Sequence, residues 1–305
     1  MIHLTGLPDT GKVYIQTLDD PLFRKSQIGL HVLRLDKIHT IVSGNKWFKL
    51  KYYLGKAAKE GKGIITFGGP YSNHLIATAY ACKQAEIPSV GIIRGEEPAR
   101  HSATLRDILS YGMTLQFVSR QEYKTENLVS QIQQTHPDFI VVEEGGRGEP
   151  GIRGAEEILQ LTTLDQYTHI MCAIGTGTMM TGIINSSLPH QHNIGIPVIK
   201  LNNSATNAVS EYIHNNSVYK NYQIQYDFHF GGYAKRNDEL IQFMNQVYHQ
   251  HSIPTDFVYT GKLFYAAIKL VQNGYFEPGS NILVIHSGGL QGNRSLPEGL
   301  LHFSF

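Results

Sequence analysis

The chain has 305 residues, which corresponds to about two domains at roughly 150 residues each. Its 26 basic and 25 acidic side chains leave a formal net charge of +1, which argues against nucleic acid or a membrane surface as the main partner. Hydrophobic residues make up 41% of the chain, enough for a large core, and no apolar run reaches the length of a membrane span. Because two cysteines (Cys82 and Cys172) exclude a disulfide framework and the first residues lack signal-peptide features, we expect a soluble cytoplasmic protein.

After residue 60, short apolar runs alternate with longer segments of helical character. We expect strands at residues 63–67, 89–93, 115–118, 139–142, 170–174, 196–201 and 282–285. We expect a helix that follows from the segment at residues 43–50 and runs to about residue 58. Further helices are expected at residues 73–84, 103–110, 121–134, 154–161, 179–185, 205–214, 239–249 and 262–272. This alternation is typical of βαβ units with a buried parallel sheet. Two sheets are expected, and one larger sheet is the alternative arrangement.

Glycine clusters directly follow several of these expected strands. They are Gly68-Gly69, Gly145-Gly146, Gly175-x-Gly177 and Gly288-Gly289. A single pair of glycines after a strand is most often a tight turn. Four clusters at the carboxyl ends of parallel strands instead predict a ligand crevice, because ligands of open α/β sheets bind along that edge.

The cluster Gly175-Thr176-Gly177-Thr178 lies between an expected strand and an expected helix. Glycines let backbone N–H groups close around an anion, the start of a helix favours negative charge, and the threonine hydroxyls add donors. No Lys-Ser or Lys-Thr pair follows, so the segment is not a nucleoside-triphosphate loop, and its spacing does not match a dinucleotide fingerprint. We therefore favour phosphate binding over a simple turn.

Two further segments carry polar side chains that could take part in binding or chemistry. Lys46 and Lys49 lie three residues apart beside Trp47, and apolar surroundings disfavour the ammonium form, as an imine-forming amine requires. The alternative is that both are ordinary surface lysines. Ser72 and Asn73 follow the first glycine pair, where they either cap a helix or offer polar groups to a carboxylate or a ring hydroxyl.

Four motifs then occur in one order along the chain: Gly44-Asn45-Lys46-x-x-Lys49-Leu50, Phe67-Gly68-Gly69-x-x-Ser72-Asn73, Gly175-Thr176-Gly177-Thr178 and Val258-Tyr259-Thr260-Gly261-Lys262. From about residue 33 to the end, the chain resembles the pyridoxal-phosphate enzymes of the 1-aminocyclopropane-1-carboxylate deaminase and D-cysteine desulfhydrase family. The resemblance implies an α/β fold of the tryptophan synthase β type (fold type II), with two domains that are each a mainly parallel twisted sheet flanked by helices. The larger domain would comprise residues 1–48 and 148–305 and bind pyridoxal 5'-phosphate, and residues 49–147 would form a smaller inserted domain.

The resemblance also implies roles for individual residues. Lys46 matches the Schiff-base lysine, which holds the cofactor aldehyde and moves the substrate's α-proton, and Lys49 matches a lysine near the phosphate. Asn73 matches the asparagine beside the cofactor's 3-oxygen, and Ser72 matches the serine that meets the substrate carboxylate. The remaining matches are the phosphate cup at Gly175, Thr176, Gly177 and Thr178 and the two active-site tyrosines, Tyr259 and Tyr233.

Two positions depart from the deaminases of this family. Thr260 stands where they carry a glutamate close to the pyridine nitrogen, and Ser287 stands where they carry a leucine. We expect both hydroxyls to border the cofactor, and a neutral hydroxyl near the nitrogen gives a weaker electron sink than a carboxylate does. Both departures favour a lyase of the D-cysteine desulfhydrase type, which performs a β-elimination to pyruvate and ammonia, with sulfide released from D-cysteine.

Other functions stay open at this point. The deaminase activity is the first alternative, and a pyridoxal-phosphate-binding protein without turnover is an alternative of another class. A related eliminase or racemase also fits, since Ser43 replaces the first glycine of the family's Gly-Gly-Asn-Lys motif, whereas a dinucleotide-binding oxidoreductase lacks its fingerprint. We expect a small amino acid as substrate, no nucleic-acid or membrane partner and, from the family alone, a homodimer.

Several other polar residues receive mainly structural interpretations. Cys172 lies on an expected buried strand and is assigned to the core, and Glu143 and Glu144 are assigned structural roles. His74 either lines the site or belongs to a helix start, and His286 is placed near the cofactor ring. The 15 histidines contain no pair spaced four residues apart, so we expect no helical metal site.

Overall fold

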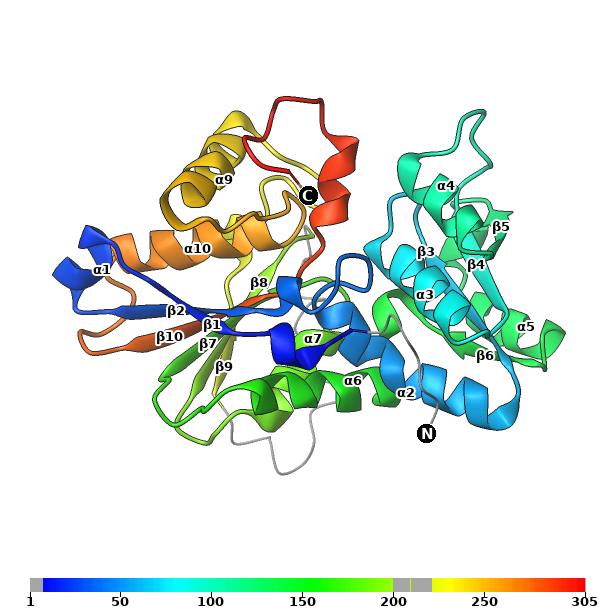
Figure 1. Cartoon of the computed structure of the whole chain (residues 1–305), viewed down its shortest axis with the longest axis horizontal. Coiled ribbons are helices and arrows are strands. Elements are labelled where there is room, and N and C mark those ends of the chain that lie inside the picture. The colour runs from blue at the N-terminus through cyan, green and yellow to red at the C-terminus, as the bar shows by residue number, and fades with distance from the viewer. Residues whose placement is uncertain (1–7, 200–208, 210–220, 305) are drawn as a thin grey trace.

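The computed structural model describes residues 8–199, 209 and 221–304 and contains two sheets (Figure 1). The larger sheet has the strand order β1 (Ile15–Leu18), β2 (Gly29–Arg34), β10 (Asn281–His286), β7 (His169–Ile174), β8 (His192–Pro197) and β9 (Tyr222–Ile224). The smaller sheet has the order β5 (Thr114–Val118), β4 (Ser89–Arg94), β3 (Gly63–Gly68) and β6 (Phe139–Val142). This arrangement confirms the predicted fold class and excludes the single larger sheet.

All strand pairs are parallel except β1 with β2, which pair antiparallel at one edge of the larger sheet. The sequence did not predict β1, β2 or the short helix α1 (Pro21–Ser26) that joins them. In β1 only Leu18 is buried, so this edge strand carries no apolar run that could reveal it. The boundaries proposed for the two domains stay a prediction, although the four strands of the smaller sheet all lie between residues 63 and 142.

The helices of the described residues are α2 (Asn45–Glu60), α3 (Asn73–Gln84), α4 (Ala103–Ser110), α5 (Leu128–Thr135), α6 (Glu149–Glu156), α7 (Thr178–Ser186), α9 (Asp238–His251) and α10 (Thr260–Gln272). Two predicted helices are wrong in extent. The segment 121–134 divides into a 3-10 turn, η3 (Glu122–Lys124), and α5, and the segment 154–161 begins earlier, at α6, because Pro150 favours the first turn of a helix. The predicted strand 196–201 is also wrong in extent, because β8 begins at His192 and ends at Pro197, and residues 200–201 lie outside the described residues. The predicted helix 205–214, except residue 209, lies outside them as well.

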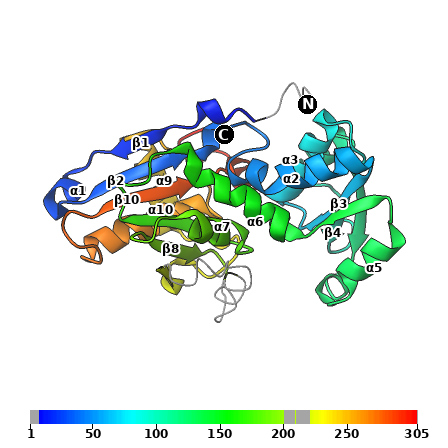
Figure 2. The same cartoon turned by 90° about the horizontal axis from the view of Figure 1, so that it is seen from below.

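The two faces of the larger sheet are covered by different helices. Helices α9 and α10 lie on one side and α6 and α7 on the other (Figures 1 and 2). Neighbouring strand residues therefore enter separate cores: Val32 packs with Phe264 of α10, whereas Leu33 packs with Ile183 of α7. This alternation follows from the two-residue period of a strand, and it explains why these strands are apolar throughout.

Helix α2 connects the two cores. Phe48 on its first turns is buried in the core under the larger sheet, whereas Leu54 is buried with the smaller sheet. Helix α6 packs closely against α2, because a Cβ at Gly154 would lie 1.7 Å from the carbonyl oxygen of Phe48. Only a glycine permits this approach, which brings the start of α2 to the carboxyl-terminal edge of the larger sheet.

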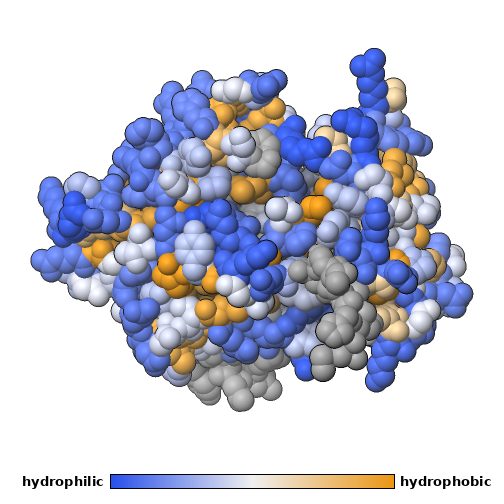
Figure 3. Space-filling model, in the orientation of Figure 1, coloured by the Kyte–Doolittle hydropathy of each residue, from blue (hydrophilic) through white to orange (hydrophobic). Residues whose placement is uncertain are grey.

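The surface carries few large apolar side chains. The exposed ones among the described residues are Tyr14, Tyr71, Leu109, Tyr233 and Tyr275. The face of the molecule in Figure 3 is mainly hydrophilic, with hydrophobic residues in small scattered groups. Within the described part of the chain, no helix is long and apolar enough to cross a membrane.

Candidate active site

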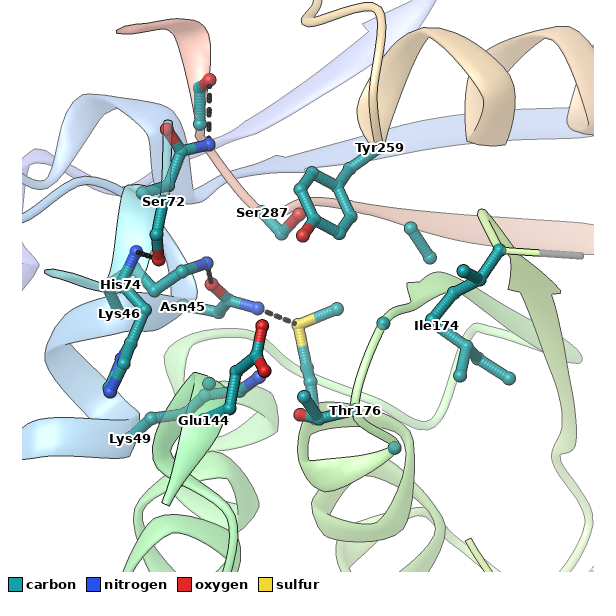
Figure 4. A pocket seen from close by; sticks show the side chains of 18 of the residues that line it. Asn45, Lys46, Lys49, Ser72, His74, Glu144, Ile174, Thr176, Tyr259 and Ser287 are labelled. Atoms are coloured by element: carbon teal, nitrogen blue, oxygen red, sulfur yellow. Dashed lines mark hydrogen bonds between the residues drawn. The ribbon is translucent and has the colours of Figure 1, made fainter. Parts of the chain in front are cut away.

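A cavity of about 300 Å³ lies where the carboxyl-terminal edges of the two sheets face each other (Figure 4). Its lining includes ten of the predicted site residues, namely Lys46, Lys49, Ser72, Asn73, Gly175, Thr176, Gly177, Tyr233, Tyr259 and Ser287. Thr178 and Thr260 lie outside this lining. The volume is at the lower end of the range for ligand sites, so the cavity suits small ligands.

The backbone of Ser287 holds the start of α2 and thereby places Lys46. Gly44 precedes the helix with a φ of 61°, and a Cβ there would lie 1.8 Å from the carbonyl oxygen of Ser287. The Asn45 amide donates to the same oxygen at 3.2 Å. Lys46 Nζ then donates to Asn45 Oδ1 at 2.7 Å and lies 5.9 Å from the centroid of the Tyr259 ring.

The environment of Lys46 makes its amine reactive. Desolvation lowers the pKa of Lys46 to about 8, although the negative charge of Asp256 opposes the shift. A lysine with this pKa is partly neutral near pH 7.5, and the neutral amine is the form that attacks an aldehyde or accepts a proton.

Lys49 lies about one turn further along α2 and is buried. Desolvation and, to a smaller extent, the positive charge of Lys46 lower the pKa of Lys49 to about 7, whereas Cys172 opposes the shift. An anion bound beside Lys49 would restore its positive charge. Lys49 is therefore suited to an anionic ligand.

The predicted phosphate cup forms the turn between β7 and α7. Gly177 caps the helix with a φ of 86°, and Thr176 and Thr178 hydroxyls lie 3.0 Å apart. Gly145 (φ 72°) contacts this turn from the end of β6, where a Cβ would lie 2.7 Å from a side-chain carbon of Thr176. The first backbone N–H groups of a helix lack intrahelical acceptors, so this turn and Lys49 offer the groups that an anion would need.

Two buried polar atoms on α3 have no hydrogen-bond partner among the described residues: Asn73 Oδ1 and His74 Nδ1. Asn73 Nδ2 donates to the Gly289 carbonyl at 3.2 Å. Thr66 donates its hydroxyl proton to Val142, so His74 Nε2 must be the donor in its 2.8 Å contact with Thr66, and Nδ1 is left as an acceptor. Because both residues line the cavity, these unpartnered atoms fit a site that takes a polar ligand.

Two tyrosines border the cavity on the side of the larger domain. The rings of Tyr233 and Tyr259 meet edge to face, with centroids 6.2 Å apart. Burial raises the pKa of both phenols, and a hydrogen bond between them raises the pKa of Tyr259 further while it lowers that of Tyr233. Both side chains are therefore neutral hydrogen-bonding groups at physiological pH.

Thr260 is fully buried one residue beyond Tyr259 and does not line the cavity. Its Oγ1 donates to Asp256 Oδ1 at 2.7 Å, and it accepts a 2.8 Å hydrogen bond from the Asp256 amide. The Asp256 carboxylate also accepts from the amides of Val258, Tyr259 and Thr260. Asp256 and Thr260 thus fix the turn that carries Tyr259, and contact of Thr260 with the cofactor stays a prediction.

Glu144 lines the cavity, although the sequence suggested only a structural role for it. It begins the turn η4 (Glu144–Gly146) after β6, and its Oε2 accepts a 2.8 Å hydrogen bond from the Tyr123 hydroxyl. Arg94 lies 5.4 Å from the centroid of the Tyr123 ring and lines the cavity from the end of β4. The available signal was that Glu144 adjoins one of the glycine pairs at the ligand edge.

The family model described as "Pyridoxal-phosphate dependent enzyme" matches residues 21–288 of the chain. The chain belongs to this family. It is therefore an enzyme that uses pyridoxal phosphate, and the predicted cofactor is confirmed.

Several curated relatives match most of this pyridoxal-phosphate enzyme. A putative 1-aminocyclopropane-1-carboxylate deaminase of Pyrococcus horikoshii is 27% identical over 89% of the chain and 88% of the relative. A bifunctional D-cysteine desulfhydrase/1-aminocyclopropane-1-carboxylate deaminase of Arabidopsis thaliana is 27% identical over 95% of the chain and 80% of the relative. A D-cysteine desulfhydrase of Salmonella typhi is 23% identical over 94% and 93%.

Solved structures give the same fold. A crystal structure described as an ACC deaminase homologue has a TM-score of 0.78 and 25% sequence identity, and the match covers 95% of this enzyme and 92% of that chain. Serine racemase from Dictyostelium discoideum has a TM-score of 0.66 at 14% identity, covering 90% and 93%. The second likeness supports the fold alone.

The cavity residues fit the cofactor. The cup at residues 175–178 together with Lys49 would hold the phosphate, and Lys46 offers an amine of lowered pKa for the aldehyde. Asn73 has an unpartnered amide atom for a ring oxygen. Ser287 lines the cavity directly after β10, whereas His286 behind it contacts Pro254 O at 2.7 Å.

Proposed function

We propose that this enzyme is a lyase that performs β-elimination on a small amino acid, with D-cysteine as the preferred substrate. With one water consumed, the products would be pyruvate, ammonia and sulfide. The observation that carries the proposal is the charge of the cavity wall. Among the described lining residues Glu144 is the one carboxylate, and it follows β6, whereas Ser287 after β10 and Tyr259 before α10 offer hydroxyls.

The residues of the chain account for the steps of an elimination. Bound pyridoxal phosphate supplies an aldehyde for the substrate amine and a ring that withdraws electrons from Cα. Ser72 Oγ accepts from the amides of His74 and Leu75 at 3.2 Å, which leaves its O–H free to donate to the substrate carboxylate. Lys46, once neutral, can accept the Cα proton, and the electron pair of the Cα–H bond expels sulfide from Cβ.

A neutral wall near the ring would favour elimination over the opening of a cyclopropane. A hydroxyl beside a ring nitrogen stabilises its protonated form less than a carboxylate does. The weaker electron sink suffices when the substrate carries a leaving group on Cβ. Opening an unactivated cyclopropane requires a stronger electron sink, and the deaminase activity therefore ranks second. It is kept as the alternative proposal because several relatives are named as deaminases.

The test compares product release from four amino acids by the purified holoenzyme. D-cysteine, L-cysteine, D-serine and 1-aminocyclopropane-1-carboxylate are supplied at equal concentrations, and keto-acid formation is followed. We expect the highest kcat/KM with D-cysteine. Faster turnover of the cyclopropane substrate would establish the deaminase instead, and no product from any of the four would support binding without turnover.

A further inference from the structure

Lys262 is a fully buried lysine that lies outside the cavity lining, on the first turn of α10. Its Nζ donates to three backbone carbonyls: Gly232 at 2.7 Å, His229 at 2.9 Å and Val198 at 3.3 Å. A lysine ammonium has three N–H donors, so all of them are used. Among the described residues, the ammonium group is therefore held by backbone carbonyls and makes no ion pair.

Two of these carbonyls belong to the loop that carries Tyr233. Phe230 and Ala234, on either side of Tyr233, have φ values of 52° and 54°. Residues with a Cβ seldom occupy this left-handed region, and they stay there only where the surrounding structure imposes it. The bonds from Lys262 to the carbonyls of His229 and Gly232 supply such a constraint.

Two further contacts connect the Tyr233 loop and the end of β8 to their surroundings. Phe230 packs edge to face on Tyr265 of α10, with centroids 4.8 Å apart. The third acceptor, Val198, donates its own amide to the Ile174 carbonyl, at the end of the strand that leads into the phosphate cup. Lys262 therefore joins the Tyr233 loop, the end of β8 and the helix that begins after Tyr259.

We propose that Lys262 is a positioning residue that holds Tyr233 against Tyr259 at the active site through the carbonyls of His229 and Gly232. Its contribution to catalysis rests on the proposed function, which places the substrate in the cavity that Tyr233 lines. Burial of a cation costs free energy, as the lowering of the pKa of Lys262 to about 8 by desolvation shows. A gain in overall stability does not account for the buried Lys262, whereas the need to fix the Tyr233 loop does.

The first experiment reads the loop without reference to any substrate. Native holoenzyme is treated with trypsin, and fragments that end at the exposed Lys235 or Arg236 are quantified by mass. Lys262→Met should raise this cleavage rate about tenfold, as expected for the loss of charge-assisted hydrogen bonds. Lys83→Met is the control, because Lys83 of α3 also donates to a backbone carbonyl, that of Ser110, but lies outside the loop and the cavity lining; it should leave the rate unchanged.

If Lys262→Met fails to fold, Lys262→Gln keeps a hydrogen-bond donor at this position and should give a smaller increase in the same rate. A cleavage rate equal to that of the wild type in a folded variant at position 262 contradicts the proposal. Because this readout needs no turnover, it decides the proposal even if none of the four amino acids is a substrate.

The second experiment is a double-mutant cycle with Tyr233→Phe, on whichever amino acid is turned over best. If Lys262 acts through Tyr233, Lys262→Met should lower kcat/KM in the wild type but have almost no further effect in the Tyr233→Phe enzyme. Equal fold-losses in the two backgrounds would overturn the assigned role. A merely structural lysine would give such equal losses.

Discussion

The hydroxyl of Thr260 donates a 2.7 Å hydrogen bond to Oδ1 of Asp256, and both side chains are fully buried. This bond directs Thr260 into the turn before α10 instead of into the cavity. The same turn fixes Tyr259, whose amide donates to Asp256 and whose ring lies near Lys46. Position 260 therefore affects the active site through the backbone of its neighbour.

This relationship predicts the effect of the glutamate that the deaminases carry at this position. Thr260→Glu would place a second carboxylate beside Asp256 in a buried site and remove the hydroxyl that Asp256 accepts from. We expect a loss of about 3 kcal/mol in the free energy of unfolding, without a gain of cyclopropane turnover. Chemical denaturation of Thr260→Glu, with Thr260→Ser as the control that keeps the hydroxyl, measures it, and a stable variant with deaminase activity would refute it.

Ser72 has two functions that a matched pair of variants can separate. It caps α3, so Ser72→Ala should cost about 1 kcal/mol of stability, and Asn237→Ala, which removes the cap of α9, should cost a similar amount. Of these two residues, only Ser72 lines the cavity. We therefore expect KM to rise about tenfold in Ser72→Ala and to stay unchanged in Asn237→Ala. Steady-state kinetics on both variants measures this, and equal KM values would show that Ser72 has a capping role alone.

The buried lysines predict how the stability of the cofactor-free enzyme depends on pH. The pKa values of Lys46 and Lys49 are lowered to about 8 and about 7 in the folded chain, whereas the unfolded chain keeps the ordinary value of 10.5. Between these values the unfolded chain binds more protons, so stability rises with pH, by up to about 1.4 kcal/mol per pH unit for each lysine. The free-energy cost of burying the two protonated lysines is fully present below pH 7.

Thermal melting of the cofactor-free enzyme between pH 7 and 9 measures this dependence. The melting temperature should rise with pH in the wild type and rise less in Lys49→Met. A melting temperature that falls over this interval, or an equal slope in the two proteins, would show that the lysines are not desolvated. Inorganic phosphate should reduce the slope, because an anion beside Lys49 restores its charge.

The sequence predicted which segments meet at the site but not how each side chain is used. The glycine clusters at strand ends placed Ser72 and Thr176 at one crevice, because the carboxyl ends of parallel strands share an edge, whereas Ser287 was placed there by the family resemblance. Lys46 was found through its apolar neighbours. These inferences use only residues that are close together in the sequence, and such local relationships stay the same in the folded chain.

The residues that were missed depend on contacts between distant segments. Glu144 lines the cavity because β6 of the smaller sheet ends there, and no local pattern records this arrangement. The bond from Thr260 to Asp256, four residues earlier, was likewise not predicted, and the contact of Thr260 with the cofactor stays a prediction. Lys262 could not be distinguished from an exposed lysine until its three carbonyl partners were known.

The account depends most on which amine holds the cofactor. Lys46 and Lys49 both line the cavity and both have a lowered pKa. Borohydride reduction of the holoenzyme fixes the cofactor to its lysine, and mass spectrometry of the proteolytic peptides then locates it. The account predicts the added mass on Lys46 and its loss in Lys46→Ala, and the added mass on Lys49, or on no lysine of the cavity, would contradict it.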